Sequence, residues 1–303
     1  TSAAMVLPIC AYNYPVLIVS FCLLGIGNTL MQVSLNPLVN CIVTGDKLAS
    51  TLTFGQFVKA IASFIAPIIA SLAAAKFGNW LLLFPFFLVF SIVATVYLSL
   101  TEIKEPAVKV ESLSFFKCIK LLGDSSVLLF FLGIVCHVGI DVGVNTCAPK
   151  IIMERFALPL EKAAFATSIY FLFRTIGCFA GSFILAKFPL KKFFAVSVAC
   201  MVLSMAGLFL CHTLTGLYVA IALVGFGNSN IFSMIFSSAL LYKPENDNEM
   251  SGLMIMGLIG GTIFPLLMGI LSDAFASQTG SVVVITAGVA YLIFLAARFL
   301  KKA

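Results

Sequence analysis

Residues 25–29 read Gly-Ile-Gly-Asn-Thr and residues 225–229 read Gly-Phe-Gly-Asn-Ser, so a G-x-G-N pattern returns at an offset of 200 residues. Each copy lies in an apolar stretch, and each is followed by a short loop that contains Asp46 or Asp247 and then by two further apolar stretches. At roughly 30 to 35 residues for one membrane crossing and its loop, this offset corresponds to six crossings. The repeat therefore predicts two related six-helix halves.

The composition is that of a membrane protein. Hydrophobic residues make up 61% of the 303 residues and charged residues 10%, with a mean hydropathy of +1.15. In soluble domains about a quarter of the residues are charged, so a water-soluble globule is excluded. Because the chain has two histidines, one tryptophan and no cluster of carboxylates, we expect no metal site, no cofactor and no enzyme active site.

Nine apolar stretches are long enough to cross a bilayer as helices, which predicts an all-α, polytopic transmembrane bundle. They lie at residues 15–43, 52–75, 79–100, 127–153, 163–186, 193–210, 214–241, 251–271 and 282–297, behind an apolar stub at residues 1–10. The one long polar break predicts a linker at residues 102–126. It divides residues 1–101, the remainder of the N-terminal half (helices 4–6 and a stub of helix 3), from residues 127–303, the C-terminal half (helices 7–12).

The repeat also predicts a truncated N-terminal half. Three apolar stretches precede the G-x-G-N stretch of the second half, whereas only the stub precedes it in the first. We therefore expect about 100 further residues, two crossings and most of a third, before Thr1 in the complete protein. Without them the central cavity would lack a wall, and we expect the 303-residue chain alone to be inactive.

Lysine and arginine residues are shared unevenly between alternate loops. Twelve lie on the side of the linker and the C-terminus, and four lie on the other side. The positive-inside rule then predicts a multi-pass protein of a bacterial cytoplasmic (inner) membrane, with the linker and the C-terminus in the cytoplasm. The net charge of +6 reflects this bias, so it predicts no nucleic-acid partner.

Three charged residues, Lys59, Asp141 and Arg174, lie well within predicted crossings. Each costs about 2.5 to 3.5 kcal/mol to insert at the centre of a crossing, so we expect each to face a protein or water interior and to have a partner. For Lys59, a salt bridge to an acid outside this chain and a contact with a hydroxyl-rich ligand both stay open. For Arg174, bracing of helices and binding of a substrate oxygen both stay open.

Asp141 belongs to a polar row, because His137, Asp141 and Asn145 are spaced i, i+4, i+8 and share one face of a helix. A carboxylate in this setting, beside an imidazole, could take up and release a proton near neutral pH. We expect Asp141 and His137 to couple transport to an ion, with Asn145 as a bracing or substrate residue. A purely structural hydrogen-bonded contact between helices is the alternative.

Amide side chains form a second row on the stretch 15–43, where Asn28, Gln32, Asn36 and Asn40 repeat every four residues. Amides both donate and accept hydrogen bonds, which suits a neutral ligand covered in hydroxyl groups. We expect Gln32 and Asn36 to contact this ligand. Amide contacts between helices are the alternative reading.

Two further positions extend the expected ligand site. Gln56 and Lys59 are three residues apart on the stretch 52–75 and share one helix face. Asn228 is the counterpart of Asn28 in the second copy of the repeat. We expect all three of Gln56, Lys59 and Asn228 to contact the ligand.

Several motifs resemble the fucose/glucose/galactose proton-symporter branch of the major facilitator superfamily. They are Gln32 with Asn36-Pro37, similar to E/Q-x-x-x-N-P; residues 52–56, LTFGQ, similar to L-N-x-A-Q; residues 139–143, GIDVG, similar to G-x-E-V-G; residues 225–236, GFGNSNIFSMIF, similar to G-x-x-N-S-I-M-F-P-x-I-F; and residues 251–273, SGLMIMGLIGGTIFPLLMGILSD, similar to S-G-x-L-V-M-A-I-V-G-G-A-I-x-P-x-x-G-x-x-A-D.

This resemblance implies a major facilitator fold and import of a neutral monosaccharide by alternating access, coupled to protons. Gln32 stands where fucose transporters of this branch carry a glutamate, which favours a glucose- or galactose-like hexose. Sodium coupling, as in some relatives, and another small solute remain alternatives. A channel would need rings of pore-lining charge and a cofactor enzyme paired His or Cys ligands, and neither pattern is present in the sequence.

Overall fold

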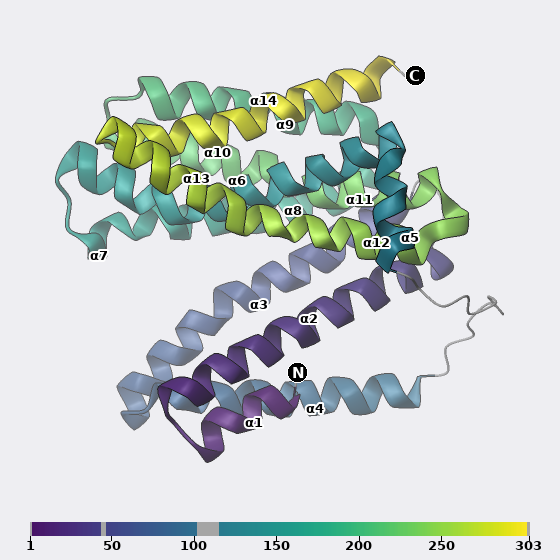
Figure 1. Cartoon of the computed structure of the whole chain (residues 1–303). Coiled ribbons are helices and arrows are strands. Elements are labelled where there is room, and N and C mark those ends of the chain that lie inside the picture. Colours follow the sequence, from purple (N-terminus) through teal and green to yellow (C-terminus); the bar gives the residue numbers. More distant parts are fainter. Residues whose placement is uncertain (1, 44–46, 102–114, 302–303) are drawn as a thin grey trace. The chain divides into compact units, whose positions relative to one another are not determined.

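The computed structural model describes residues 2–43, 47–101 and 115–301, and every regular element in these ranges is a helix (Figure 1). The chain divides into two compact units, which are described separately. The first comprises residues 1–41 and 61–112, and the second comprises residues 42–60 and 113–303. The long helix α3 (Lys47–Phe77) contributes to both units.

The first unit holds α1 (Ser2–Cys10), α2 (Tyr14–Ile42), the later part of α3, the short 3₁₀ helix η1 (Trp80–Leu82) and α4 (Leu83–Leu100). Helix α1 packs on α4, and the hydroxyls of Ser2 and Ser91 lie 2.7 Å apart. Large apolar side chains on α2 and α4 are exposed, including Tyr14 at 76% and Leu100 at 80%. Such surfaces are stable in contact with lipid and unstable in contact with water.

The second unit is a bundle of long helices joined by short connections. Its elements are the N-terminal part of α3, α5 (Phe115–Lys120), η2 (Leu121–Gly123), α6 (Ser125–Phe156), α7 (Leu160–Ala163), α8 (Phe165–Leu185), α9 (Leu190–Leu210), α10 (Leu214–Asn228), α11 (Ile231–Tyr242), η3 (Pro244–Asn246), α12 (Asp247–Met256), η4 (Gly257–Ile259), α13 (Gly260–Phe275) and α14 (Thr279–Lys301). Helix α6 contacts α8, α11, α13 and α14, and α10 contacts α8 and α9. Helices α6 and α10 therefore form the centre of this unit.

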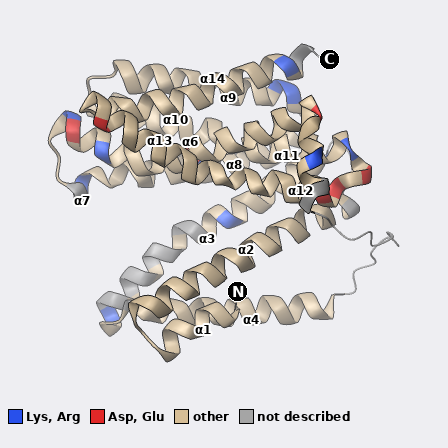
Figure 2. Cartoon of the chain, viewed as in Figure 1, with Lys and Arg blue, Asp and Glu red and all other residues tan. Residues whose placement is uncertain are grey.

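The distribution of charge fits helices that cross a membrane. In the second unit most charged residues lie at the two ends of the long helices, and the lengths between them carry few (Figure 2). Within the described residues, eight helical stretches are long and apolar enough to cross a bilayer. Helix α3, 31 residues long, coincides with the remaining predicted stretch at residues 52–75.

Two predicted crossings are interrupted. The stretch 214–241 forms α10 and α11, with Ser229 and Asn230 in the break between them. The stretch 251–271 begins within α12, tightens into a 3₁₀ turn at η4 and continues as α13. Continuous hydropathy does not reveal such breaks, because polar residues and glycines inside a bundle can end one helix and start the next.

The predicted linker is only partly described. Residues 102–114 lie outside the described residues, whereas residues 115–126 form α5, η2 and the first turn of α6. Asp124 caps α6 by accepting a hydrogen bond from the backbone N–H of Ser126 at 2.8 Å. This cap explains why α6 starts at Ser125, two residues before the predicted crossing.

Candidate functional site

The centre of the second unit carries an ion pair between α6 and α8. Arg174 Nη1 lies 3.1 Å from Asp141 Oδ2, and the hydroxyl of Tyr170 donates a hydrogen bond to Asp141 Oδ1. Tyr170 and Arg174 are four residues apart on α8, so they share a helix face and reach the same carboxylate. The two charged side chains are 22% and 19% exposed, whereas Tyr170 is fully buried.

The guanidinium of Arg174 keeps unused hydrogen-bonding capacity. Its Nε is buried and has no hydrogen-bond partner among the described residues. Because an unpaired buried donor is costly, this N–H is suited to a water molecule or to a hydroxyl group of a ligand. The charged partner of Asp141 thus lies on α8, and both bracing of helices and binding of a substrate oxygen stay predictions for Arg174.

A second polar contact joins α6 to α10. His137 Nδ1 and Asn228 Oδ1 lie 2.8 Å apart, and Asn228 Nδ2 donates to the backbone carbonyl of His137 at 3.3 Å. Since an amide oxygen only accepts, Nδ1 carries the proton in this arrangement. Both side chains are buried, with His137 at 2% exposure and Asn228 at 0%. In this structure Asn228 bonds to its neighbouring helix, and its contact with a ligand stays a prediction.

The break after Asn228 is packed tightly against α8. Asn230 Nδ2 donates to the backbone carbonyl of Gly177 at 3.0 Å. A methyl group added at Gly177 or Gly181 would lie 2.4 Å from Ser229 Oγ or 2.2 Å from Asn230 Oδ1, respectively. Only glycine therefore allows α8 to approach the break this closely. The backbone on both sides of Asn228 is held in place by this packing.

The three residues of the polar row on α6 contact different neighbouring groups. His137 contacts α10 and Asp141 contacts α8, as above. Asn145 is half-buried, and its backbone carbonyl accepts a hydrogen bond from Thr167 Oγ1 at 3.3 Å. The spacing of i, i+4, i+8 thus places three groups on one face, but each meets a different partner.

The N-terminal part of α3 belongs to the same unit as this polar cluster. The rings of Phe57 and Phe179 lie 4.9 Å apart, and Ser50 Oγ donates to the carbonyl of Ser182. Gln56 is half-buried, and Lys59 is exposed. The ammonium of Lys59 is close enough to Asp141 and Arg174 for their charges to interact. Gln56 and Lys59 therefore belong to the same unit as the ion pair.

Gln32 and Asn36 lie on α2 in the first unit, where both are half-buried. Helix α2 continues through Pro37, which is buried.

Tyr170 is the group that the sequence missed as a partner of Asp141, although its spacing of four residues from Arg174 was a usable signal. Among the described residues, no group of three His, Cys, Asp or Glu side chains could hold a metal ion.

Comparisons with known proteins bear on this arrangement. A family model described as the Major Facilitator Superfamily matches residues 1–257. A glucose/galactose transporter of Brucella abortus biovar 1 (strain 9-941) is 26% identical over 290 residues, which cover 89% of this chain and 69% of that protein. The corresponding transporter of Brucella abortus strain 2308 matches with the same values.

Two solved structures have a similar fold. The E. coli fucose:proton symporter FucP matches with a TM-score of 0.84 and 18% identity, over 98% of this chain and 80% of that chain. A bacterial homologue of the iron transporter ferroportin matches with a TM-score of 0.66 and 14% identity, over 99% of this chain and 80% of that chain. At these identities the likeness concerns the fold alone. The all-helical major facilitator fold and the family predicted from the motifs are confirmed.

Proposed function

The chain belongs to the Major Facilitator Superfamily, a family of membrane transporters rather than enzymes, and we propose that it imports a neutral monosaccharide by alternating access, driven by protons. The observation that carries this proposal is the ion pair of Asp141 and Arg174 inside a membrane-spanning bundle. Charged groups at this depth are expensive and mark ion or substrate pathways. The pair lies on α6 and α8 of the second unit, and transporters built from repeats bind their substrate near the bilayer midplane, at the interface of the repeats.

The proposed substrate is a glucose- or galactose-like hexose. The transporters named for these sugars are 26% identical to this chain over 290 residues. The side chains proposed to bind the sugar are Gln32, Asn36, Gln56, Lys59 and Asn228, with Arg174 and Asn145 as further candidates. Amides, an ammonium and a guanidinium provide many donors and several acceptors, which suits hydroxyl groups. Asn228 would reach a sugar only in a conformation in which its contact with His137 is released.

The proposed coupling group is Asp141, with His137 close by on the same helix. When Asp141 is ionised, it holds Arg174 and accepts from Tyr170, which ties α6 to α8. Protonation of this carboxylate removes the charge that attracts Arg174 and frees the guanidinium for a sugar oxygen. A gradient of 100 mV supplies about 2.3 kcal/mol per proton, enough for roughly fortyfold accumulation at one proton per sugar.

The proposed location is a bacterial cytoplasmic membrane, with the linker and the C-terminus facing the cytoplasm. The bias of twelve to four basic residues between alternate loops supports this orientation. In the second unit, α6 would then enter the membrane from the cytoplasm near Asp124 and leave it near Phe156. The proposed partners are the sugar, the coupling ion and the lipid bilayer.

Uptake of radiolabelled sugars tests the proposal. The protein, expressed from its complete coding sequence, is reconstituted into vesicles and offered D-glucose, D-galactose or L-fucose under an inward proton gradient. Accumulation of one hexose that a protonophore abolishes is expected. Accumulation that follows only a sodium gradient would instead assign sodium coupling. Failure to transport any of the three hexoses, in vesicles that contain folded protein, would overturn the proposed substrate class.

A further inference from the structure

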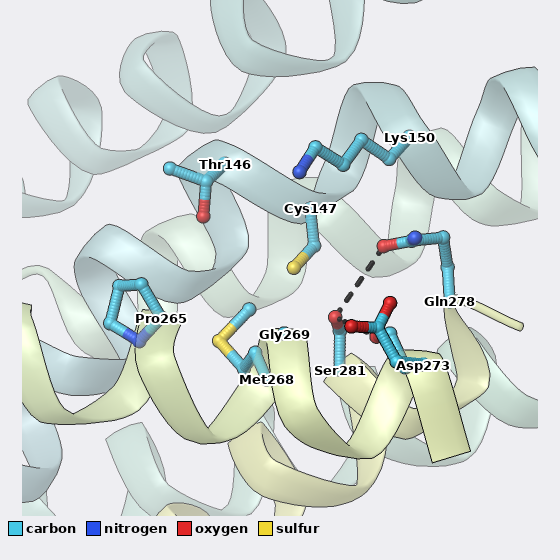
Figure 3. Close-up of a pocket in the computed structure, with 10 residues that line it drawn as sticks. Thr146, Cys147, Lys150, Pro265, Met268, Gly269, Asp273, Gln278 and Ser281 are labelled. Carbon is cyan, nitrogen blue, oxygen red and sulfur yellow. Dashed lines mark hydrogen bonds between the residues drawn. The ribbon is translucent and has the colours of Figure 1, made fainter. Parts of the chain in front are cut away.

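A polar cavity lies in the second unit, between the last turns of α6, the end of α13 and the start of α14 (Figure 3). Its volume is about 270 Å³. This is below the roughly 300 to 1,000 Å³ of common small-molecule sites, so a ligand here can be no larger than about a single sugar ring. It is distinct from the ion pair, since neither Asp141 nor Arg174 lines it.

The polar lining combines both signs of charge. Lys150 on α6 and Asp273 on α13 both line the cavity and are exposed. Within the described part of the chain, neither side chain forms an ion pair or a hydrogen bond, so the ammonium and the carboxylate remain available. Their charges cancel, and the cavity therefore selects neither an anion nor a cation.

The remaining lining adds neutral polar groups and an apolar floor. Thr146, Gln278 and Ser281 contribute hydroxyl and amide groups, and Met268 and Pro265 contribute apolar surface. The Thr146 hydroxyl donates to backbone carbonyls of α6, and the Ser281 hydroxyl bonds to Ser272 and Gln278. These two hydroxyl oxygens can therefore accept from a ligand, and the donors are the Gln278 amide and the Lys150 ammonium. Donors and acceptors around an apolar floor suit a neutral molecule with several hydroxyl groups and exposed C–H faces. A hexose has this chemistry.

The walls of the cavity are formed in the absence of a ligand. Glu154 on α6 accepts hydrogen bonds from Ser277 Oγ and from the backbone N–H of Gln278, both at 2.6 Å. The hydroxyls of Ser272 and Ser281 lie 2.7 Å apart and join α13 to α14. These contacts fix the turn that closes the cavity, so little ordering remains for a ligand to impose.

The cavity and the ion pair share helix α6. Thr146 and Lys150 follow Asp141 by five and nine residues, which is about 8 and 14 Å along the axis at 1.5 Å per residue. In the proposed orientation this end of α6 faces the outside of the cell. At about 100° per residue, however, Thr146 and Lys150 lie about 140° and 180° around α6 from Asp141. The pocket therefore opens on the face of α6 that packs against α13 and α14, and the ion pair lies on the face that meets α8.

We propose that this cavity, the α6–α13 pocket, is a second binding site for one hexose, on the opposite face of α6 from the ion pair. This inference rests on the proposed function, because it takes the same class of substrate. It adds a second binding position and assigns it to Lys150, Asp273 and the turn that follows α13.

Gly269 provides a way to fill the pocket. It lines the cavity, and a Cβ atom added there would meet no other heavy atom within 4 Å. A Gly269→Leu side chain can therefore occupy the space without displacing the protein. Gly252 on α12 is the matched control, since its added Cβ also meets nothing within 4 Å and it does not line the pocket.

The test measures equilibrium binding and uptake of the radiolabelled hexose that the wild-type protein transports. Two sugars per wild-type protein and one per Gly269→Leu protein are expected. For uptake, we expect KM and kcat to be unchanged, because the pocket and the ion pair lie on opposite faces of α6. The double variant Lys150→Gln, Asp273→Asn should behave like Gly269→Leu, and Gly252→Leu should behave like wild type.

Three results would overturn the inference while leaving the proposed function intact. One is a single bound sugar in wild type whose affinity Gly269→Leu does not change. The second is the same loss in Gly252→Leu, which would trace the effect to the helices rather than to the pocket. The third is displacement of the sugar in the pocket by an equal concentration of L-serine, which would assign a zwitterion. Absence of any hexose binding would instead overturn the proposed function itself.

Discussion

Arg174 Nη1 and Asp141 Oδ2 lie 3.1 Å apart and join α8 to α6 in the interior of the second unit. Tyr170 donates to the other carboxylate oxygen, so one acid is held by two side chains of one helix face. A charge pair of this kind is stable only while both members are ionised. Loss of either charge therefore changes how α6 and α8 are held together, which makes the pair suitable for coupling protonation to movement.

Replacement of this acid should separate accumulation from exchange. In the Asp141→Asn protein no proton can be taken up at residue 141, so uphill accumulation of sugar is expected to be lost, while exchange of sugar across the membrane is retained. Uptake under a proton gradient and counterflow in the same vesicles measure the two activities. Glu245→Gln, in the exposed turn η3, is the control and should keep both. Unchanged accumulation by Asp141→Asn would eliminate Asp141 as the coupling group.

The ion pair of Asp141 and Arg174 should be measurable as a coupling free energy between the two residues in unfolding experiments. Asp141→Asn, Arg174→Gln and the double variant form a double-mutant cycle, read by thermal or chemical unfolding in detergent. Residues in one salt-bridge network commonly interact by about 0.5 to 3 kcal/mol, and we expect a stabilising value in this range. The double variant should therefore lose less than the sum of the two single losses. Strict additivity would show that the pair does not contribute to the free energy of unfolding.

The contact of His137 with Asn228 should be structural in the absence of sugar. Asn228→Ala removes the acceptor of His137 Nδ1 and leaves a buried donor unpaired, which commonly costs about 1 to 3 kcal/mol. A lower unfolding midpoint is expected. Asn248→Ala, at an exposed position near the start of α12, should change stability by no more than about 0.5 kcal/mol. Equal stability of the two variants would contradict a contribution from this contact.

The close approach of α13 to α6 should make Gly260 intolerant of a methyl group. An added Cβ would lie 2.0 Å from the backbone carbonyl oxygen of Val135, which cannot move without moving α6. Overpacking of this kind typically costs about 1 to 3 kcal/mol, so Gly260→Ala should unfold at a lower temperature. Gly252→Ala, with open space at its Cβ, should be neutral or up to about 1 kcal/mol more stable. A stabilised Gly260→Ala protein would disprove the close packing.

A salt bridge outside the crossings should make stability depend on pH. Lys243 Nζ lies 2.9 Å from Asp124 Oδ2. The hydrogen bond from Lys243 lowers the pKa of Asp124 from its usual 3.8, and the bond to Asp124 raises the pKa of Lys243 from its usual 10.5. The carboxylate therefore stabilises the fold above pH 3.8 and loses this effect as the pH falls through its lowered pKa. The ammonium stabilises it below pH 10.5 and loses this effect above.

Between about pH 4 and pH 10, the unfolding midpoints of wild type and Lys243→Gln should thus differ by a constant amount. At lower and at higher pH this difference should shrink. Lys187→Gln, at an exposed position in the turn between α8 and α9, is the control and should not show this profile. A difference that grows as the pH falls below the usual pKa of Asp124 would reverse the assigned sign and contradict the bridge.

Local patterns predicted most of the helices. Each described helix longer than about fifteen residues coincides with an apolar stretch that hydropathy identified, since burial in lipid requires about twenty apolar residues in a row. The break at Ser229 and Asn230 was not predicted. The residues around it are as apolar as an uninterrupted crossing, and only packing against Gly177 and Gly181 makes the break possible.

The sequence singled out the two members of the ion pair but did not predict that they pair with each other. Charges inside apolar stretches identified Asp141, Arg174 and Lys59, because a charge at that depth is conspicuous in any sequence. The roles assigned to the site residues remain predictions: substrate contact for Gln32, Asn36, Gln56, Lys59 and Asn228, and ion coupling for Asp141 and His137. The α6–α13 pocket gave no signal in the sequence, because Lys150 and Asp273 lie at helix ends, where charges are ordinary.

The sequence by itself determined the membrane environment, the helical stretches and the family, because hydropathy and motif spacing are properties of neighbouring residues. Only the tertiary structure decided that Asp141 meets Arg174 and Tyr170, that His137 meets Asn228 across 91 positions, and that the ends of α6 and α13 enclose a cavity. These pairings depend on how helix faces turn toward one another. That rotation is set by close packing of side chains and glycines between helices, which no local pattern encodes.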